Sequence, residues 1–343
     1  MCIAGSSFGL QFEQELAAHI QAKYVIACGN GTDALQIALM ALQLKPGDEV
    51  ILPAFTYVAA GEAIALLGMV PVFVDVDPET FNIDVSQIER SINSRTRAII
   101  PVHLFGQCCD MENLLIIAKK HGIAVLEDAA QAIGASYRFS DGTVKQAGTM
   151  GTIGTTSFFP SKNLGCFGDG GAVFTNDDEL AKRIRMIGSH GQARQYYHEI
   201  VGVNSRLDTL QAAILRVKLT RLNEYSVARN CVAVRYDMAF AGDSRYIIPI
   251  RDARCSHVFN QYTLRVSKID RDDLKAYLEK KGISSMVYYP LPLHKQHAYL
   301  NYAHDDEALR NSISICDQVI SLPIHTEMKT EVQDYIIQTI LAY

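Results

Sequence analysis

Short apolar runs alternate with helix-like segments along the first half of this 343-residue chain. Each run is apolar without alternation, which is typical of a strand buried on both faces. A chain that alternates such strands with helices forms a mostly parallel sheet covered by helices. The sequence therefore predicts an α/β protein, with strands at residues 24–28, 49–52, 70–74, 98–102, 123–126, 155–159 and 171–175.

The helical periodicity lies between these runs and continues beyond them. Residues 206–240 contain neither Gly nor Pro, so we expect one long or broken helix that bridges two domains. After it, a smaller α+β unit is predicted, and the large and small domains are expected to cover residues 1–225 and 226–343. The predicted helices cover residues 12–20, the segment after Gly31, 57–67, 85–92, 111–121, 271–281 and 329–342, and the small unit adds strands at 257–266 and 284–289.

Composition excludes several classes of protein. The formal net charge is −5 and the basic residues are scattered, so no nucleic-acid partner is expected. No run reaches the roughly 18 apolar residues of a membrane span, and the first residues lack the pattern of a secretion signal. We expect a cytoplasmic protein. Its eight cysteines are dispersed, which favours free thiols and no metal site.

One segment holds a lysine among aromatic residues and glycines. Residues 155–172 read TTSFFPSKNLGCFGDGGA, with Lys162 near the middle. An amine in a buried turn has a lowered pKa and a free lone pair, so it can attack an aldehyde as a nucleophile. A lysine in a glycine-rich surface loop explains this segment equally well. The rest of the chain has to decide between the two.

Three further segments stand at the ends of predicted strands. Gly29, Gly31 and Thr32 form a glycine turn before a helix, which suits a phosphate, although a capping turn with Thr32 or Asp33 as the cap explains it as well. Asp128 ends another strand and would hold a ring nitrogen protonated, or would cap a helix.

Phe55 and Tyr57 follow a third strand and would stack on a flat ring, or belong to the core. Ser157, close to Lys162, could add a hydroxyl to the same phosphate. Phosphate cup, stacking face, acid and lysine occur in this order along the chain. Together they are what a pyridoxal 5′-phosphate (PLP) site requires, and the combination is far more specific than any single member.

The chain resembles the DegT-type sugar aminotransferases, PLP enzymes of fold type I, the fold of aspartate aminotransferase. The resemblance covers nearly the whole sequence. It is carried by the segments GNGTDAL, PAFTYVAAGEAIALLGMVPVFVDVDPETFNID, PVHLFGQCCDM, VLEDAAQAIGA, SFFPSKNLGCFGDGGA, VNSRLDTLQAAIL and YYPLPLHKQHAY.

The resemblance implies roles for individual residues. Lys162 would bind the cofactor aldehyde covalently, Asp128 would pair with the pyridine nitrogen, Gln131 would bond the phenolic oxygen and Tyr57 would stack on the ring. Phosphate contacts would come from Gly31, Thr32, Ser157 and, across a homodimer interface with shared active sites, Asn204 of the neighbouring subunit. Arg206 would then meet the substrate across that interface. Tyr288, Tyr289 and His294 lie in a loop of the small domain and would contact the nucleotide or sugar, or belong to an interface or the core. His190 would line the same pocket, or is an ordinary loop histidine.

Within the family, the lysine segment and residues 190–215 look most like enzymes that aminate carbon 3 of UDP-2-acetamido-2-deoxy-3-oxoglucuronate, with L-glutamate as donor, for surface polysaccharide and lipopolysaccharide synthesis. The alternatives are aminotransferases that act on carbon 3 or 4 of dTDP- or UDP-linked keto-deoxysugars, and a non-catalytic protein that senses PLP or a sugar nucleotide. A related dehydratase chemistry would replace Lys162 by histidine. The family normally has some two dozen residues before the stretch that begins here at Met1, so we expect either that the start is displaced or that the sugar-site wall is built differently.

Overall fold

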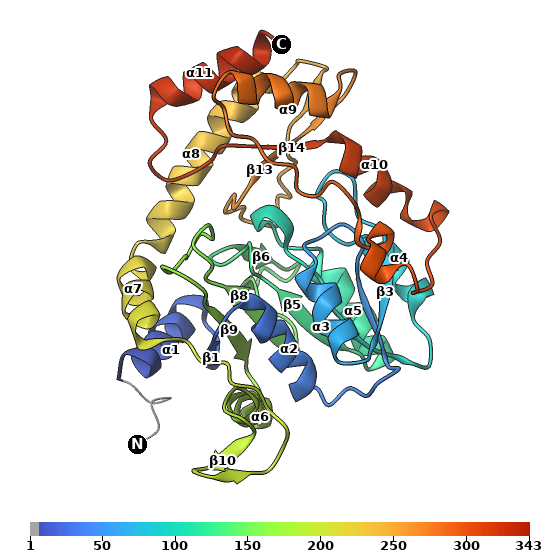
Figure 1. Cartoon of the computed structure of the whole chain (residues 1–343), viewed down its shortest axis with the longest axis vertical. Coiled ribbons are helices and arrows are strands. Elements are labelled where there is room, and N and C mark those ends of the chain that lie inside the picture. The colour runs from blue at the N-terminus through green and yellow to red at the C-terminus, as the bar shows by residue number, and fades with distance from the viewer. Residues whose placement is uncertain (1–6) are drawn as a thin grey trace.

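The computed structural model describes residues 7–343 and is built around one seven-stranded sheet (Figure 1). β9 runs antiparallel to both of its neighbours, β1 and β8, and the other pairs are parallel. The predicted mostly parallel sheet is confirmed. The strand order is β1 (Tyr24–Cys28), β9 (Gly171–Thr175), β8 (Ile153–Ser157), β5 (Ala124–Asp128), β4 (Thr96–Ile99), β2 (Glu49–Pro53) and β3 (Val70–Val74).

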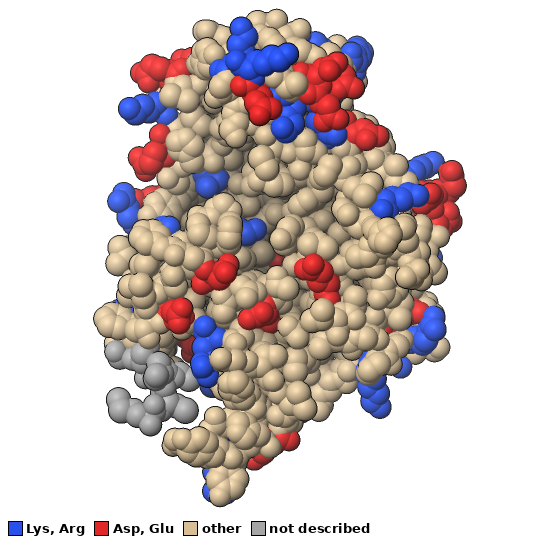
Figure 2. Space-filling view, viewed as in Figure 1, with Lys and Arg blue, Asp and Glu red and all other residues tan. Residues whose placement is uncertain are grey.

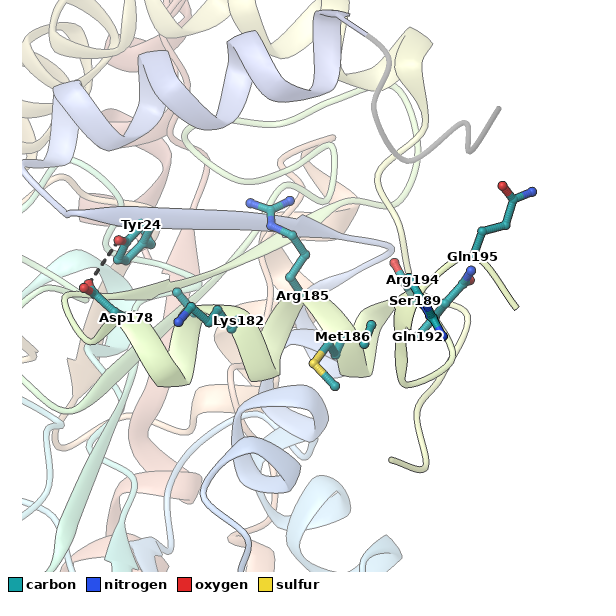
Figure 3. Close-up of a pocket in the computed structure, with 11 residues that line it drawn as sticks. Tyr24, Asp178, Lys182, Arg185, Met186, Ser189, Gln192, Arg194 and Gln195 are labelled. Carbon is teal, nitrogen blue, oxygen red and sulfur yellow. Dashed lines mark hydrogen bonds between the residues drawn. The ribbon is translucent and has the colours of Figure 1, made fainter. Parts of the chain in front are cut away.

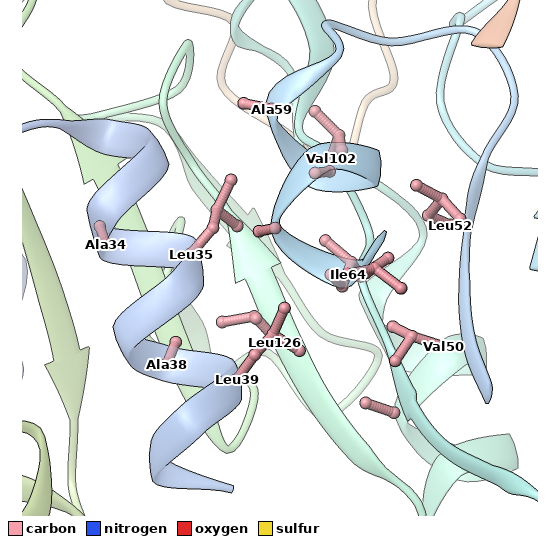
Figure 4. Packing of buried hydrophobic residues seen from close by; sticks show 14 of the residues in the cluster. Ala34, Leu35, Ala38, Leu39, Val50, Leu52, Ala59, Ile64, Val102 and Leu126 are labelled. Carbon is pink, nitrogen blue, oxygen red and sulfur yellow. The ribbon is translucent and has the colours of Figure 1, made fainter. Parts of the chain in front are cut away.

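Helices cover both faces of this sheet because the strands are apolar on both faces. In β2, Val50 and Leu52 pack into one core and Ile51 into the other. The first core lies under α2 (Gly31–Ala41), α3 (Ala59–Leu66) and α6 (Asp178–Gly188), and the second under α4 (Val85–Ser91) and α5 (Met111–His121). Figure 4 shows Leu35 and Leu39 of α2 turned toward Leu126 of β5. This packing fixes the start of α2 above the sheet.

The segment predicted as one long or broken helix is broken. α7 (Thr209–Leu219) packs on α1 (Ser7–Ile20), and α8 (Leu222–Phe240) begins three residues after α7 ends. The expected domain boundary at residue 225 falls inside α8, so the division at that residue stays a prediction.

Beyond α8 the chain forms a three-stranded antiparallel sheet with its own core. Its strands and helices are β12 (Tyr246–Ile247), β13 (Tyr262–Val266), β14 (Val319–Leu322), α9 (Arg271–Lys280), α10 (Arg310–Gln318) and α11 (Thr330–Leu341). The predicted strand at 284–289 is wrong, because this segment makes one isolated bridge, Met286 with Ser321, and otherwise runs irregularly. The predicted strand at 257–266 begins only at Tyr262.

Several elements of the structure were missed in the sequence, and two of them, α6 (Asp178–Gly188) and α10 (Arg310–Gln318), are amphipathic helices. α6, α10 and β14 are regular elements that the sequence reading did not predict. The shorter ones are β6 (Ser136–Arg138), β7 (Val144–Gln146), β10 (Gln192–Arg194), β11 (Tyr197–His198) and the 3₁₀ turns η2 (Leu104–Gly106), η3 (Leu293–Lys295), η4 (His297–Tyr299) and η5 (Glu307–Leu309). Two-residue and three-residue strands are too short to show a period.

Acidic and basic side chains are interspersed over the face shown in Figure 2, with no broad area of one sign. Within residues 7–343, no helix is both long enough and apolar enough to cross a bilayer. The seven cysteines of this part of the chain are free thiols. Cys2, like the rest of the first six residues, lies outside the described residues.

Candidate active site

A cavity of about 560 Å³ opens at the carboxyl edge of the large sheet. Parallel strands end at one common edge, and ligands of open α/β sheets bind there. The turns after β1, β2, β5 and β8 meet at this cavity, and irregular segments around residues 260 and 288 form its other wall. Nine of the predicted site residues line it: Gly31, Thr32, Tyr57, Asp128, Gln131, Ser157, Lys162, Tyr288 and Tyr289.

Lys162 lies in a tight turn between β8 and β9. Its backbone N–H donates to the carbonyl of Phe159 at 2.8 Å. A Cβ at Gly165 would lie 2.5 Å from the carbonyl oxygen of Pro160, so the turn has room only for glycine there. Burial lowers the pKa of Lys162, and the negative charge of Asp128 partly offsets this effect. The amine is therefore more often neutral, and so nucleophilic, than a surface lysine.

The end of β5 carries two carboxylates with different surroundings. Glu127 is fully buried away from the cavity and accepts from the backbone N–H groups of Gly148, Met150 and Gly151 and from His103 Nε2. Asp128 lines the cavity. Successive side chains of a strand point to opposite faces, which explains the difference. Of this pair, Asp128 is the carboxylate available to a ligand.

Asp128 does not cap a helix, since residues 130–134 form turns. Its carboxylate accepts from the N–H of Ala130 at 2.9 Å. Burial raises the pKa of Asp128, while this hydrogen bond and the charge of Lys162 act in the opposite direction. A cationic ring nitrogen placed beside it would remove the cost of burying the carboxylate.

The glycine turn after β1 is the start of α2, and its cap is Asn30, not Thr32 or Asp33. The side-chain oxygen of Asn30 accepts from the N–H of Asp33 at 2.8 Å. Gly31 and Thr32 are the first two residues of the helix. N–H groups at this end have no hydrogen-bond partner within the helix, and the helix dipole has its positive end here. Both residues line the cavity. This end of α2 is suited to a phosphate.

Gly31 lies against the end of β8. A Cβ placed on it would come within 2.7 Å of the Ser157 Cβ, closer than real Cβ atoms approach. Gly31→Ala must therefore displace the turn, and we expect it to weaken PLP binding about tenfold, which corresponds to about 1.4 kcal/mol. Equilibrium dialysis of the ligand-free protein measures this affinity. Pyridoxal, which lacks the phosphate, is the control: an equal loss of pyridoxal affinity would contradict a phosphate site at Gly31.

An aromatic wall faces this turn. Phe55 is fully buried and belongs to the core, whereas Tyr57 is 59% exposed at the cavity. The ring centroid of Tyr57 lies 6.2 Å from that of Tyr289. Gln131 accepts from the N–H of Phe105 at 2.7 Å and donates to the Tyr289 hydroxyl at 3.2 Å. Its amide orientation is thus held by one donor and one acceptor.

Four predicted site residues do not line the cavity. His294 is a correction: η3 turns its imidazole inward, where it is fully buried 6.3 Å from the ring of Phe73, so it does not reach a substrate in this cavity. His190 is exposed near the end of α6, outside the cavity, which also differs from the expectation. Asn204 and Arg206 are exposed as well, and neither contributes to the cavity of its own chain.

The structure adds residues that the sequence reading missed. Asp169 and Thr56 lie inside segments that the sequence analysis singled out, so the sequence could have identified them. Asn260 and Gln261 come from the segment predicted as a strand and reach the cavity through tertiary contacts. No local pattern could have identified these two.

A second concavity of about 690 Å³ lies along α6 (Figure 3). It is lined by residues of β1, α6 and the β10 hairpin. Two of its cations are paired, Arg185 with Glu13 and Lys182 with Glu179, and Arg194 lies over the ring of Tyr197. It lacks a buried amine or acid. The chemistry of the molecule therefore belongs to the first cavity.

Comparison with known proteins agrees with this geometry. Residues 3–341 match the model of the DegT/DnrJ/EryC1/StrS aminotransferase family. The chain is 49% identical over 322 residues to a UDP-2-acetamido-2-deoxy-3-oxo-D-glucuronate aminotransferase from Pseudomonas aeruginosa, covering 93% of this chain and 86% of the relative. It is 47% identical over 336 residues to a Pleiotropic regulatory protein from Geobacillus stearothermophilus, covering 97% and 88%.

The fold also matches solved structures. One is Ntda from Bacillus subtilis with bound cofactor PMP, at a TM-score of 0.90 and 33% identity, covering 98% of this chain and 77% of that one. The cavity fits such a group, because Gly31 and Thr32 bring a positive helix end to it and the half-buried amine of Lys162 lies near the buried carboxylate of Asp128. The chain therefore belongs to the DegT/DnrJ/EryC1/StrS aminotransferase family, and its cofactor is PLP.

Proposed function

We propose that this aminotransferase moves the amino group of L-glutamate to carbon 3 of UDP-2-acetamido-2-deoxy-3-oxoglucuronate, in a pathway that makes surface polysaccharide. The reaction class rests on the half-buried amine of Lys162 and the buried carboxylate of Asp128, which line one cavity. The choice of sugar rests on the 49% identity to the Pseudomonas enzyme that is named for this substrate.

In this proposal Lys162 has two tasks. Its neutral amine would hold PLP through the aldehyde carbon, and PLP would supply the electrophilic carbon at which the amine of glutamate replaces that of Lys162. Once free, Lys162 Nζ takes the proton from the α carbon of the donor and delivers it to the former aldehyde carbon. The same group works in reverse when the keto sugar arrives. The lowered pKa of Lys162 suits a base at neutral pH.

Asp128 keeps the pyridine nitrogen protonated, and the bound PLP supplies an electron sink for the carbanion. Gly31, Thr32 and Ser157 hold the phosphate, Gln131 donates to the phenolic oxygen, and Tyr57 stacks on the ring. Tyr288 and Tyr289, from the irregular segment beside Tyr57, contact the nucleotide or sugar. All of these side chains line the same cavity, which supports the assignment.

We further propose a homodimer in which Asn204 of a second copy contacts the phosphate and Arg206 of that copy pairs with the sugar carboxylate. A guanidinium matches a carboxylate with two parallel hydrogen bonds. Both side chains are exposed and unused in their own cavity. Between them, Ser205 donates to Asp33 at 2.6 Å and accepts from the N–H of Gly29, which holds this segment beside the phosphate turn.

The substrate is tested by offering glutamate with UDP-linked oxoglucuronate, or with dTDP- and UDP-linked keto-deoxysugars, and following 2-oxoglutarate. We expect the uronate to react fastest, and Arg206→Ala to raise its KM more than that of a sugar without a carboxylate. Reaction of the deoxysugars alone would establish the alternative, for which a relative at 41% identity is named. Turnover of none of these sugars would favour a sensing protein, although Lys162 and Asp128 are both present.

A further inference from the structure

A buried pair of amides flanks Lys162. Asn163 and Asn260 are 6% and 3% exposed. Asn163 Nδ2 donates to the carbonyl of Val258 at 2.8 Å. Asn260 Nδ2 donates to Asn163 Oδ1 at 3.0 Å and to the carbonyl of Ser161 at 3.5 Å. The residues directly before and after Lys162 are therefore both held by a segment that lies about a hundred positions further along the chain.

This outer segment is itself fixed from behind. Arg229 of α8 is buried, and its guanidinium donates to the carbonyls of Phe259 at 3.0 Å and Asn260 at 3.3 Å. The ring of Phe259 stacks on His257 with centroids 3.7 Å apart. Backbone groups that are buried must find partners, and here a side chain of the long helix supplies them. The support for the lysine turn thus begins in α8.

The lysine turn needs such support because its outer side is open. Phe159 is 51% exposed, and Pro160 and Ser161 are exposed as well. Lys162 has a flexible four-carbon stem, so the direction of its amine depends on how the backbone beneath it is held. A displacement of about 1 Å can cost about a hundredfold in a positioned reaction.

We infer that Asn163 and Asn260 form a positioning pair that aims the Lys162 amine into the cavity. The inference rests on the proposed role of Lys162. The two amides bond to the backbone and to each other beside the lysine turn, whereas the reacting atom is Nζ of Lys162. Residues of the C-terminal part of the chain thereby set the reactivity of a lysine that belongs to the large sheet.

The test follows covalent capture of PLP by the ligand-free protein. Lys162 Nζ bonds to the aldehyde carbon with loss of one water, borohydride then delivers hydride to the new carbon–nitrogen bond, and mass spectrometry locates the label. We expect Asn260→Ala to slow labelling of Lys162 about tenfold. Asn163→Ala should act similarly, and the double variant should be no slower, because the two amides act as one unit.

The matched control is Gln333→Ala. Gln333 is 2% exposed, and its Nε2 donates to the carbonyl of Val232 at 2.7 Å, so this change also removes a buried amide. It should lower Tm without slowing capture. If Asn260→Ala does not fold, Asn260→Asp keeps the shape, removes the donor and should slow capture in the same way.

Each outcome decides something. Capture by the folded Asn260 variant at the rate of Gln333→Ala would overturn the positioning role and leave the proposed function standing. Absence of label at Lys162 in the unaltered protein would instead overturn the proposed role of Lys162. Slow capture in Asn260→Ala and Asn163→Ala, with normal capture in Gln333→Ala, supports the inference.

Discussion

Lys162→Ala is expected to lower the transamination rate at least about a thousandfold, because one side chain provides both the covalent link to PLP and the proton transfer. The half-reaction with glutamate measures the loss directly, as 2-oxoglutarate formed per protein. The visible absorbance of the lysine-linked cofactor should disappear in the same variant. Binding of PLP through its phosphate should persist, since the start of α2 is untouched.

Lys182→Ala is the control for this experiment. Lys182 is an exposed lysine on α6 that lines the second concavity and pairs with Glu179. Its loss should change neither the rate nor the absorbance. If the Lys162 variant kept the absorbance and the activity, some other amine would hold the cofactor and the proposed site would be wrong.

Asp128→Asn is expected to lower the rate about a hundredfold or more, since the ring nitrogen loses the charge that keeps it protonated. The same change should stabilise the ligand-free protein at neutral pH. Burial raises the pKa of Asp128 above its ordinary value of 3.8, so the folded state holds the proton more tightly than the unfolded state. The stability that this proton provides is complete below pH 3.8 and is lost as pH rises through the raised pKa.

Thermal unfolding of the ligand-free proteins at several pH values tests this sign. The Tm of Asp128→Asn should exceed that of the unaltered protein at pH 7, and the difference should shrink as the pH falls toward 3.8. An Asp128→Asn protein that is as active as the unaltered protein, or that has a lower Tm at pH 7, would contradict the account of a carboxylate that is costly to bury in its charged form.

The sheet could be predicted from the sequence because its strands are apolar on both faces. The run at 70–74 matches β3 residue for residue, and the helix at 111–121 matches α5. The segment at 284–289 is apolar only from Met286 onward and becomes irregular, because it packs its two tyrosines against the cavity and makes one bridge to β14. Local composition does not distinguish the two environments.

The candidate site divides in the same way. Gly31, Asp128 and Lys162 follow buried strands, so the topology alone brings them to one edge. His294 was judged from its neighbours in sequence, but the direction of a side chain on a short 3₁₀ turn depends on packing. Asn260 reaches the lysine turn only through the folded chain. Residues placed by strand order were predictable, and residues placed by tertiary contact were not.

The antiparallel strand β9 also affects the order in which strands of the large sheet can pair during synthesis. β1 lies at an edge and pairs only with β9, where Tyr24 is opposite Thr175. Chains emerge from the ribosome with their earlier residues first, so β1 leaves the exit tunnel long before its partner has been translated. β2 and β3 can pair at once. The strand before the phosphate turn therefore gains its sheet neighbour late, after the lysine turn has been made.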